Sequence, residues 1–208
     1  VPSVNFDEDN DYLTNFIKEG WIGEKLNHPA VMKIYPHSAS SKFLYHACEY
    51  VEGQTLADWI ADNPQPPLVK VRDILSQLVK ALRVLQRHDV VHCDIKPDNF
   101  MIDQHGRVKL IDYGSASVGA IDEWTVDNDM PQGTLNYTAP EVLLGQPNTH
   151  LSDLYSLAIM VYQMLCGKFP YKELNQLTEA PKQLNQWRYR PLKTYRKDLP
   201  DWLDLTMS

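Results

Sequence analysis

The sequence predicts an α+β fold, and three observations support this class. Apolar residues recur at helical spacing near the N-terminus, two runs rich in β-branched and aromatic residues follow, and helical patterns around one short hairpin fill the rest. Of the 208 residues, 43% are hydrophobic and 23% are charged, which is typical of a globular chain. This length suits one ordinary domain, or a little more than one lobe of a larger fold.

The N-terminal part is predicted to form one helix and two strands. Residues 10–26 read as an amphipathic helix because apolar side chains recur at helical spacing, at Leu13, Phe16, Ile17, Ile22 and Leu26. His28-Pro29 ends this helix, because a proline disfavours helical backbone in the residue before it. Residues 31–36 and 42–50 are rich in Val, Ile, Phe, Tyr and Leu and predict strands, with a turn at 38–41.

The next segments predict two helices and a hairpin. Residues 55–62 form a short helix that an Asn-Pro pair ends, and residues 68–89 form a long helix with one polar face. Residues 100–103 and 107–111 are short apolar runs on either side of a Gln-His-Gly turn, which predicts a β-hairpin.

A long loop is predicted before the C-terminal helices. Residues from Asp112 to about Pro140 show little periodicity, and a loop of this length inside a compact domain is usually functional. Residues 151–166 form the most apolar helix, which we expect to be buried. Residues 171–188 are polar and helical at best, and residues 202–207 begin a further helix.

Charge and cysteine content exclude several classes of function. The formal net charge is −7, which gives no reason to expect nucleic-acid binding. Cys48, Cys93 and Cys166 are far apart, so we expect no disulfide framework or zinc site and favour a reducing, cytoplasmic compartment. The histidines show no metal spacing, because His92 lies beyond the predicted end of the helix that carries His88.

No segment is predicted to span a membrane. The longest apolar run, from Leu154 to Leu165, is too short and reads as a buried helix. No signal peptide is visible, and the chain begins with Val1 rather than Met, so the targeting of the whole protein stays open.

The segment from Val91 to Asn99 holds the densest group of reactive side chains. Phosphoryl transfer from ATP requires a carboxylate near the attacking hydroxyl, a cation on the γ-phosphate and groups that bind Mg²⁺. Asp94 can accept the proton of the hydroxyl, Lys96 can reach the γ-phosphate, and Asn99 offers a neutral oxygen to a hard cation. Asp112 can supply the second metal ligand, because the predicted hairpin brings it back towards Asn99.

These residues stand in the order and spacing of a known family. The segment His92-Cys93-Asp94-Ile95-Lys96-Pro97-Asp98-Asn99 resembles the catalytic loop of protein kinases, and Asp112-Tyr113-Gly114 resembles their metal-binding motif. The resemblance covers nearly the whole chain, with motifs that look like the regulatory helix, the hinge, the end of the activation segment and the central buried helix. These are Phe16-x-x-Glu19 with His28-Pro29, Glu49-Tyr50-Val51, Gly133-Thr134-x-x-Tyr137-x-Ala139-Pro140-Glu141, and Ser152-Asp153-Leu154-Tyr155-Ser156-Leu157.

The resemblance implies a protein serine/threonine kinase, an enzyme that transfers the γ-phosphoryl group of ATP to protein hydroxyls with ATP and Mg²⁺ as cofactors. Asp94 would then be the catalytic base, Lys96 the γ-phosphate contact, and Asn99 and Asp112 the Mg²⁺ ligands. Lys96 and Thr134 are typical of the serine/threonine branch, in which the Thr134 hydroxyl bridges Asp94 and Lys96.

The resemblance also implies a hinge that meets adenine. The backbone groups of Glu49 and Val51 would contact the base, and Met101 would lie beneath it. Cys48, just before the hinge, is expected to be a small buried residue.

Other residues are given structural tasks. Asp153 would hydrogen-bond the backbone of the catalytic loop, although a plain helix N-cap is also open, and Tyr113 and His92 would stack in the core between the lobes. Several cations are most simply surface charges: Lys109, Lys168, Lys182 and Arg188. The cluster Trp187-Arg188-Tyr189-Arg190 stays open between this reading and contact with a protein substrate.

The implied architecture is a protein-kinase-like α+β fold with a truncated N-lobe and a mostly helical C-lobe. Residues 1–51 would be an N-lobe remnant with the hinge, and residues 52–208 the C-lobe with the catalytic loop and activation segment. No Gly-rich loop or strand lysine precedes Glu19, and counting back puts that lysine just before Val1. The chain also ends before the Arg that usually pairs with a buried Glu141, so we expect this piece alone to be unstable and inactive.

Cys93 departs from the family pattern. It stands where most members have an Arg that grips a phosphate on the activation loop. We therefore expect a kinase that is active, or regulated, by means other than loop phosphorylation, so that replacing Ser115, Ser117 and Thr125 with Ala leaves most intrinsic activity.

Two alternatives and one narrower resemblance stay open. A pseudokinase-type binding module would usually lack one of the four reactive residues, and a small-molecule phosphotransferase of the aminoglycoside kinase type would lack the segment Ala139-Pro140-Glu141. The stretches 43–45, 52–56 and 152–154 resemble bacterial kinases fused to a metal-dependent protein phosphatase, which suggests a covalently fused phosphatase domain as a partner.

Overall fold

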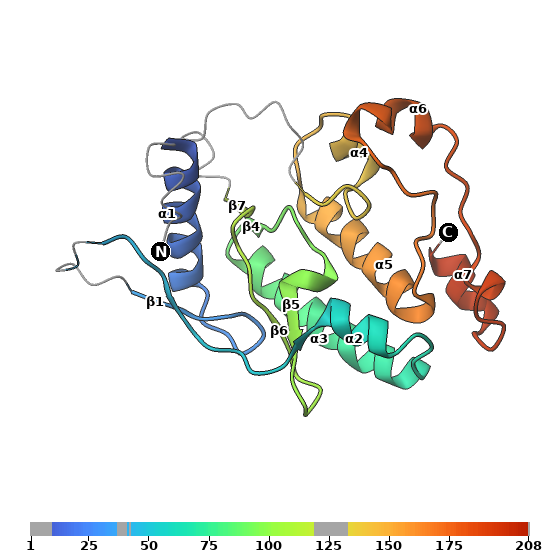
Figure 1. Cartoon of the computed structure of the whole chain (residues 1–208), viewed down its shortest axis with the longest axis horizontal. Coiled ribbons are helices and arrows are strands. Elements are labelled where there is room, and N and C mark those ends of the chain that lie inside the picture. Colours follow the sequence, from blue (N-terminus) through green and yellow to red (C-terminus); the bar gives the residue numbers. More distant parts are fainter. Residues whose placement is uncertain (1–9, 37–40, 42, 119–132, 208) are drawn as a thin grey trace.

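The computed structural model describes residues 10–36, 41, 43–118 and 133–207. Helix α1 (Asn10–Lys25) lies at one end of the long axis, and helix α7 (Asp201–Met207) lies near the other (Figure 1). Between them, a short hairpin and a set of helices form a mixed α/β body, as the sequence predicts. All described helices except α1 come after residue 55 in the sequence. The N-terminal part is thus small and the C-terminal part mostly helical, as predicted.

Helix α1 packs closely against a two-stranded antiparallel sheet of β1 (Ile34–Tyr35) and β2 (Ala47–Cys48). Glycine permits this approach, because a Cβ atom added at Gly23 would lie 2.2 Å from Cδ1 of Ile34. On the same side, the ring of Phe16 stacks on His46 with centroids 3.9 Å apart. Ile17, the next residue, points about 100° away around the helix and is 58% exposed, although it is one of the apolar residues that indicate the helix.

The two predicted N-terminal strands are much longer than the ladder that forms. Residues 31–36 and 42–50 contribute only the register pairs Ile34↔Cys48 and Tyr35↔Ala47. No third strand joins this sheet in the described chain, and a two-stranded sheet has little to stabilise a longer ladder. Of the predicted turn at 38–41, only Ser41 belongs to the described residues.

A second sheet carries the predicted hairpin. Strands β5 (Phe100–Ile102) and β6 (Val108–Leu110) pair antiparallel, and β3 (Gln54–Thr55) adds to the free side of β5. The N-terminal part joins this sheet, because the N–H of Met32 donates to the carbonyl of Leu110. The hairpin is thus confirmed, while β3 was not predicted.

A third small sheet also escaped prediction. Strand β4 (Val90–Val91) pairs antiparallel with β7 (Ser117–Val118), which lies inside the segment predicted to be a loop. Two residues per strand are too few for an alternating pattern to be visible in the sequence.

Helices α2 (Leu56–Asp62) and α3 (Leu68–Arg87) confirm two predictions. A capping box starts α2, since the Thr55 hydroxyl accepts from the N–H of Asp58 and the Asp58 carboxylate accepts from the N–H of Thr55. Helix α3 ends before the predicted residue 89, because Asp89 has a φ of 56° and cannot continue a right-handed helix.

The most apolar predicted helix is α5 (His150–Cys166), and it is buried on most sides. Its N-cap is Thr149, whose hydroxyl accepts from the N–H of Ser152, and Gly167 ends it in the left-handed conformation. Two short helices flank it in sequence, α4 (Pro140–Leu143) and α6 (Ala180–Leu184). The predicted helical region 171–188 contains only α6 and a preceding 3₁₀ turn at Leu177–Glu179.

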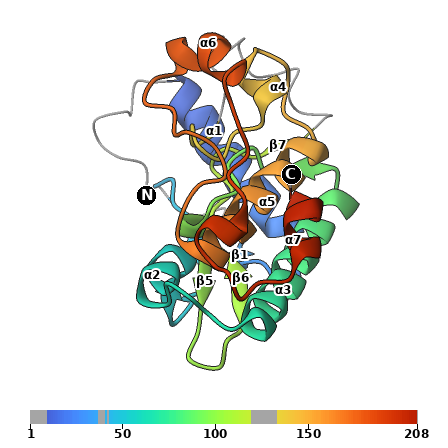
Figure 2. The ribbon, with the colours of Figure 1, turned by 90° about the vertical axis from the view of Figure 1, so that its right-hand side faces the viewer.

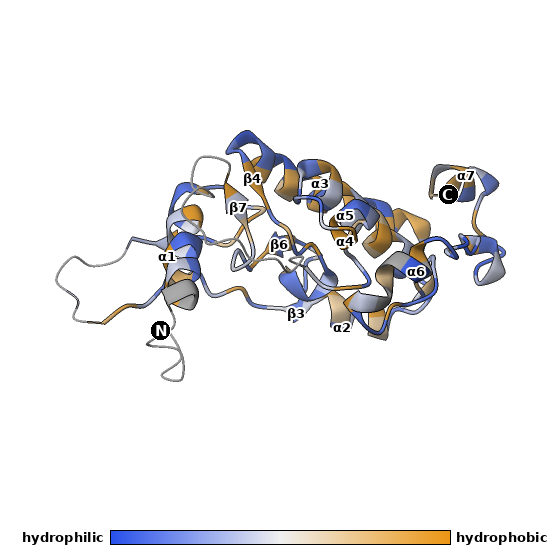
Figure 3. Ribbon diagram, turned by 90° about the horizontal axis from the view of Figure 1, so that it is seen from above, coloured by the Kyte–Doolittle hydropathy of each residue, from blue (hydrophilic) through white to orange (hydrophobic). Residues whose placement is uncertain are grey.

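One continuous core joins α2, α3, the hairpin and α5. Figure 3 shows the apolar colouring along α5, which lies against α3. A buried cation also lies in this region: Arg196 pairs with Asp198 and donates to the carbonyls of Pro66 and Leu165. Within the residues that the structure describes, no helix combines the length and the apolar content that a membrane crossing would need.

Candidate active site

Asp153 of α5 anchors the loop between β4 and β5 through two hydrogen bonds to its backbone. The carboxylate of Asp153 accepts the backbone N–H of His92 at 2.8 Å and that of Cys93 at 3.1 Å. Cys93 has a φ of 66°, a conformation that side chains rarely adopt and that these bonds help to maintain. The predicted structural task of Asp153 is confirmed, and the alternative N-cap role is wrong because Thr149 caps α5.

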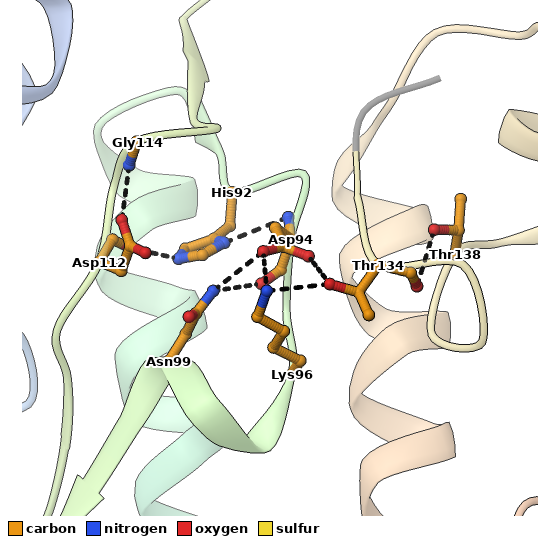
Figure 4. A network of polar contacts seen from close by, with 8 residues as sticks. All are labelled: His92, Asp94, Lys96, Asn99, Asp112, Gly114, Thr134 and Thr138. Atoms are coloured by element: carbon orange, nitrogen blue, oxygen red, sulfur yellow. Dashed lines mark hydrogen bonds and ion pairs between the residues drawn. The ribbon is translucent and has the colours of Figure 1, made fainter. Parts of the chain in front are cut away.

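Asp94, Lys96 and Thr134 form a closed triangle of polar contacts (Figure 4). Nζ of Lys96 lies 2.7 Å from Oδ2 of Asp94 and donates to the Thr134 hydroxyl at 2.9 Å. That hydroxyl in turn donates to Oδ1 of Asp94 at 2.7 Å. The structure therefore brings together three predicted site residues that lie up to 40 positions apart.

Asn99, at the end of the 3₁₀ turn Pro97–Asn99, adds two further hydrogen bonds to Asp94. Its side-chain Nδ2 donates to the backbone carbonyl of Asp94 at 2.8 Å and to Oδ2 at 3.3 Å. These two bonds fix which end of the amide faces Asp94, because only the nitrogen can donate. Oδ1 of Asn99 is left without a donor among the described residues.

Asp112 joins the same network through His92. Nε2 of His92 lies 2.6 Å from the backbone carbonyl of Asp112, and Nδ1 accepts from the N–H of Asp94 at 3.3 Å. A carbonyl can only accept, so the imidazole carries its proton on Nε2. The ring thereby links the backbones of the two loops that bear Asp94 and Asp112. We call His92, Asp94, Lys96, Asn99, Asp112 and Thr134 the polar cluster.

The surroundings of Asp94 stabilise its charged form. Burial by itself would raise the pKa of this carboxyl, but hydrogen bonds from Lys96 and Thr134 and the charge of Lys96 outweigh burial. The pKa of Asp94 is therefore held below its usual value. A carboxylate that stays ionised near neutral pH is available to accept a hydrogen bond from a hydroxyl group.

The end of the activation-segment motif packs tightly on the catalytic loop. Gly133 has a φ of 120°, and a Cβ atom added there would lie 2.8 Å from the carbonyl of Cys93. The hydroxyl of Thr138 donates to the carbonyl of Thr134 at 3.1 Å, which fixes the turn that presents Thr134. A side chain at position 133 would therefore clash with the backbone at Cys93, which explains the glycine there.

The chemistry of Asn99 and Asp112 fits a magnesium ion. Oδ1 of Asp112 accepts from the N–H of Gly114 at 2.8 Å, and its second carboxylate oxygen has no recorded donor in the described chain. Each residue thus keeps one side-chain oxygen available, and oxygen is the ligand that Mg²⁺ prefers. Within the described part, no group of three or more His, Cys, Asp or Glu could hold a metal.

Glu19 of α1 lies on the side of the cluster that holds Asp112. Burial and the nearby negative charge of Asp112 raise the pKa of Glu19. Oε2 of Glu19 lies 3.9 Å from Nδ1 of His46, so a histidine neighbours this carboxylate in the described structure.

The predicted hinge has a side-chain clamp that the sequence did not reveal. Lys109 of β6 forms an ion pair with Glu49 at 2.5 Å, so its prediction as a surface charge is wrong. Burial would raise the pKa of Glu49, but the hydrogen bond and charge of Lys109 lower it. The two residues are 60 positions apart. They meet because Met32 bonds to Leu110 of β6 and Glu49 bonds to Lys33, which places Glu49 beside this strand.

The backbone of the hinge is partly occupied. The N–H of Glu49 donates to the carbonyl of Lys33, whereas neither the carbonyl of Glu49 nor the N–H of Val51 has a recorded partner among the described residues. Met101 is half-buried on β5, opposite Thr55. Cys48 is exposed, which contradicts its predicted burial, because no described element covers that face of the two-residue strand β2.

Tyr113 anchors the metal-binding motif to the N-terminal part. Its ring is 1% exposed, and its hydroxyl donates to the carbonyl of Met32 at 2.9 Å. His92 is equally buried, but stacking between the two rings stays a prediction. A phenylalanine at position 113 could not make this hydrogen bond.

Two further predictions concern the possible phosphorylation sites of the activation segment and the burial of Glu141 at its end. Of Ser115, Ser117 and Thr125, the last lies outside the described residues. Glu141 is half-buried, so the prediction that this carboxylate is buried is wrong. Water at its exposed side provides part of the solvation that a partner would otherwise supply.

Comparison with known proteins agrees with this geometry. The family model described as a protein kinase domain matches residues 3–206. The chain is 31% identical over 186 residues to the serine/threonine-protein kinase PrkC of Bacillus subtilis, covering 88% of this chain and 28% of that protein. It is 32% identical over 186 residues to PknA of Corynebacterium glutamicum, covering 87% and 39%. For PknA of Mycobacterium tuberculosis, the identity is 31% over 192 residues, covering 89% and 44%. The chain thus spans less than half the length of each of these relatives.

Proposed function

This chain belongs to the protein kinase domain family, and we propose that it carries the phosphoryl-transfer site of a protein serine/threonine kinase. The observation that supports this most strongly is the hydrogen-bonded contact of Asp94 with Lys96, Asn99 and Thr134. The relatives reported above are named serine/threonine-protein kinases, which supports protein Ser and Thr hydroxyls as the acceptors.

In this proposal, each residue of the polar cluster has one task. Asp94 orients the attacking hydroxyl and accepts its proton, and Lys96 moves from Asp94 to the γ-phosphate when ATP binds. Asn99 and Asp112 hold Mg²⁺ through their available side-chain oxygens. The bound ion supplies positive charge that neutralises the phosphates during transfer. Thr134 keeps Asp94 in place while Lys96 is engaged elsewhere.

Adenine binds at the hinge in the same proposal. The carbonyl of Glu49 accepts a hydrogen bond from the base, and the N–H of Val51 donates one. The ion pair between Glu49 and Lys109 holds the side chain of Glu49 away from these backbone groups. Met101 provides an apolar surface beneath the ring. The chain would then divide into residues 1–51, which include the hinge, and residues 52–208.

The test is a kinase assay of the full-length protein with labelled ATP and a protein substrate. Asp94→Asn should reduce kcat by about 10²- to 10⁴-fold, because it removes the proton acceptor but keeps the shape. Asp62→Asn is the matched control, because this substitution makes the same chemical change at an exposed residue, at the end of α2. Label on phosphoserine or phosphothreonine supports the proposal.

Other outcomes would favour the alternatives. Phosphotransfer to an aminoglycoside but not to protein would indicate a small-molecule phosphotransferase. No turnover by the wild-type protein, together with tight partner binding, would indicate a pseudokinase-type module.

Regulation, fusion and location are further parts of the proposal. Cys93 in place of a phosphate-binding Arg supports activity without loop phosphorylation, so Ser115, Ser117 and Thr125 replaced together by Ala should retain most intrinsic activity. The short stretches named above support a fused phosphatase domain. The three cysteines are free thiols, which supports a reducing, cytoplasmic location.

A further inference from the structure

The segment between α6 and α7, together with Lys172 before α6, forms a cavity lined by cations and tyrosines. Its volume is about 470 Å³, and its lining includes Lys172, Arg188, Tyr189, Arg190, Thr194 and Tyr195. No Asp or Glu belongs to the lining. A volume of this size falls in the range of small-ligand pockets, roughly 300–1,000 Å³.

The backbone of this cavity is fixed by hydrogen bonds on both sides. The N–H of Arg190 donates to the carbonyl of Pro170 at 2.8 Å, and the Tyr162 hydroxyl donates to the carbonyl of Arg190 at 2.5 Å. Next to it, the Tyr189 hydroxyl donates to Oδ1 of Asp204 at 2.9 Å. The cations are therefore presented from an anchored segment rather than from a free loop.

The three cations lack a carboxylate partner. Within the described residues, no Asp or Glu forms an ion pair with Lys172, Arg188 or Arg190, and Arg188 donates only to the carbonyl of Trp187. In the same segment, by contrast, the cations Lys193 and Arg196 pair with Asp201 and Asp198. Three unpaired cations, with no Asp or Glu in the lining, give the cavity a local positive charge in a chain with a net charge of −7. The carboxylate of Asp204, which Tyr189 contacts, accepts that hydroxyl and two backbone N–H groups.

The position and charge of the cavity limit what it can bind. Figures 1 and 2 show the segment between α6 and α7 on the side of α5 that faces away from α1, so an occupant would leave the polar cluster open. A long nucleic acid would be repelled by the net negative charge of the rest of the chain. A short segment with clustered carboxylates matches both the guanidinium groups and the limited size.

We propose that this cavity is a docking site for a carboxylate-rich segment of a partner protein. Arg188 and Arg190 bind the carboxylates, and Lys172 adds a third positive charge. The Tyr195 ring and the Thr194 hydroxyl contact the peptide backbone that links the carboxylate side chains. This site goes beyond phosphoryl transfer, because docking requires neither ATP nor the polar cluster.

The experiment measures fluorescence anisotropy of a labelled peptide of alternating Glu and Gly with the full-length protein and no nucleotide. Arg188→Gln combined with Arg190→Gln should weaken binding by about 10-fold or more, because two charge-assisted hydrogen bonds to carboxylates are lost and solvent screens part of their contribution. The matched control is Arg72→Gln with Arg87→Gln, which changes the net charge equally at two exposed positions of α3 outside the cavity. The control should bind like the wild type.

Three outcomes would overturn the proposal. Equal weakening in the control variant would mean that only net charge matters. Equal binding of a peptide with Gln in place of Glu would mean that carboxylates are not recognised. Binding of a phosphoserine peptide without binding of the Glu peptide would assign the cavity to phosphate instead. Thermal unfolding of the double variant at the wild-type temperature shows that lost binding does not come from lost folding.

Discussion

The hydroxyl of Thr134 donates a hydrogen bond to Oδ1 of Asp94 over 2.7 Å, across 40 positions of sequence. The hydroxyl oxygen of Thr134 also accepts from Nζ of Lys96, so one hydroxyl orients both members of the Asp94–Lys96 ion pair. If Asp94 is the proton acceptor, as proposed, a side chain that fixes its geometry without touching the substrate should affect kcat more than KM.

Thr134→Val is therefore expected to lower kcat by about 10- to 100-fold, the equivalent of one charge-assisted hydrogen bond of roughly 1.5–3 kcal/mol. Steady-state kinetics of the full-length protein would measure this. Thr134→Ser keeps the hydroxyl and should restore most of the activity. If Val and Ser behave alike, the hydroxyl has no role in positioning Asp94.

Tyr113→Phe should lower the free energy of unfolding by about 1–2 kcal/mol. The change removes the only donor to a buried interaction with the carbonyl of Met32, and it leaves the ring in place. Urea unfolding is the measurement. Tyr171→Phe is the control, because the Tyr171 hydroxyl has no recorded hydrogen bond in the described chain, and an equal loss there would refute the assignment.

Gly23→Ala should separate α1 from the sheet and reduce stability by about 1–3 kcal/mol, a typical penalty for overpacking. The added methyl group would meet the side chain of Ile34 at 2.2 Å. In a double-mutant cycle, Ile34→Ala removes most of the clashing atoms, so the two losses should be less than additive. Simple additivity would show that the contact does not limit the approach of the helix.

Acid should destabilise the protein partly through Asp94. Its folded-state pKa lies below its unfolded value of about 3.9, because hydrogen bonds and the charge of Lys96 outweigh burial. The stability from this group is thus fully present above about pH 3.9 and is lost as pH falls through the lower folded-state pKa. Asp94→Asn should therefore show a shallower loss of unfolding free energy in acid, measured by urea unfolding at several pH values. An unchanged acid slope would contradict the pKa assignment.

Much of the helical architecture was predictable, because long periodic patterns carry their own signal. The helices α1, α2, α3 and α5 begin or end within a few residues of their predicted bounds. The short strands β3, β4 and β7 were not predicted, since two residues cannot display a period and their pairing partners are distant in sequence. The apolar character of Ile17 helped to indicate α1, but its side chain is exposed, since the face that packs carries Gly20 and Gly23.

The amino-acid sequence by itself determined which residue types occupy the reactive loops, in what order and at what spacing. Local chemistry such as the turn, the hairpin and the helix periods follows from neighbouring residues, and that is why it could be read directly. The family resemblance already implied that Thr134 reaches Asp94 and that Asp153 binds the loop at Cys93, and the tertiary structure supplied the distances. Only the tertiary structure decided that Lys109 pairs with Glu49. Each of these contacts joins residues 40 or more positions apart, and their formation depends on packing of whole elements that no local pattern encodes.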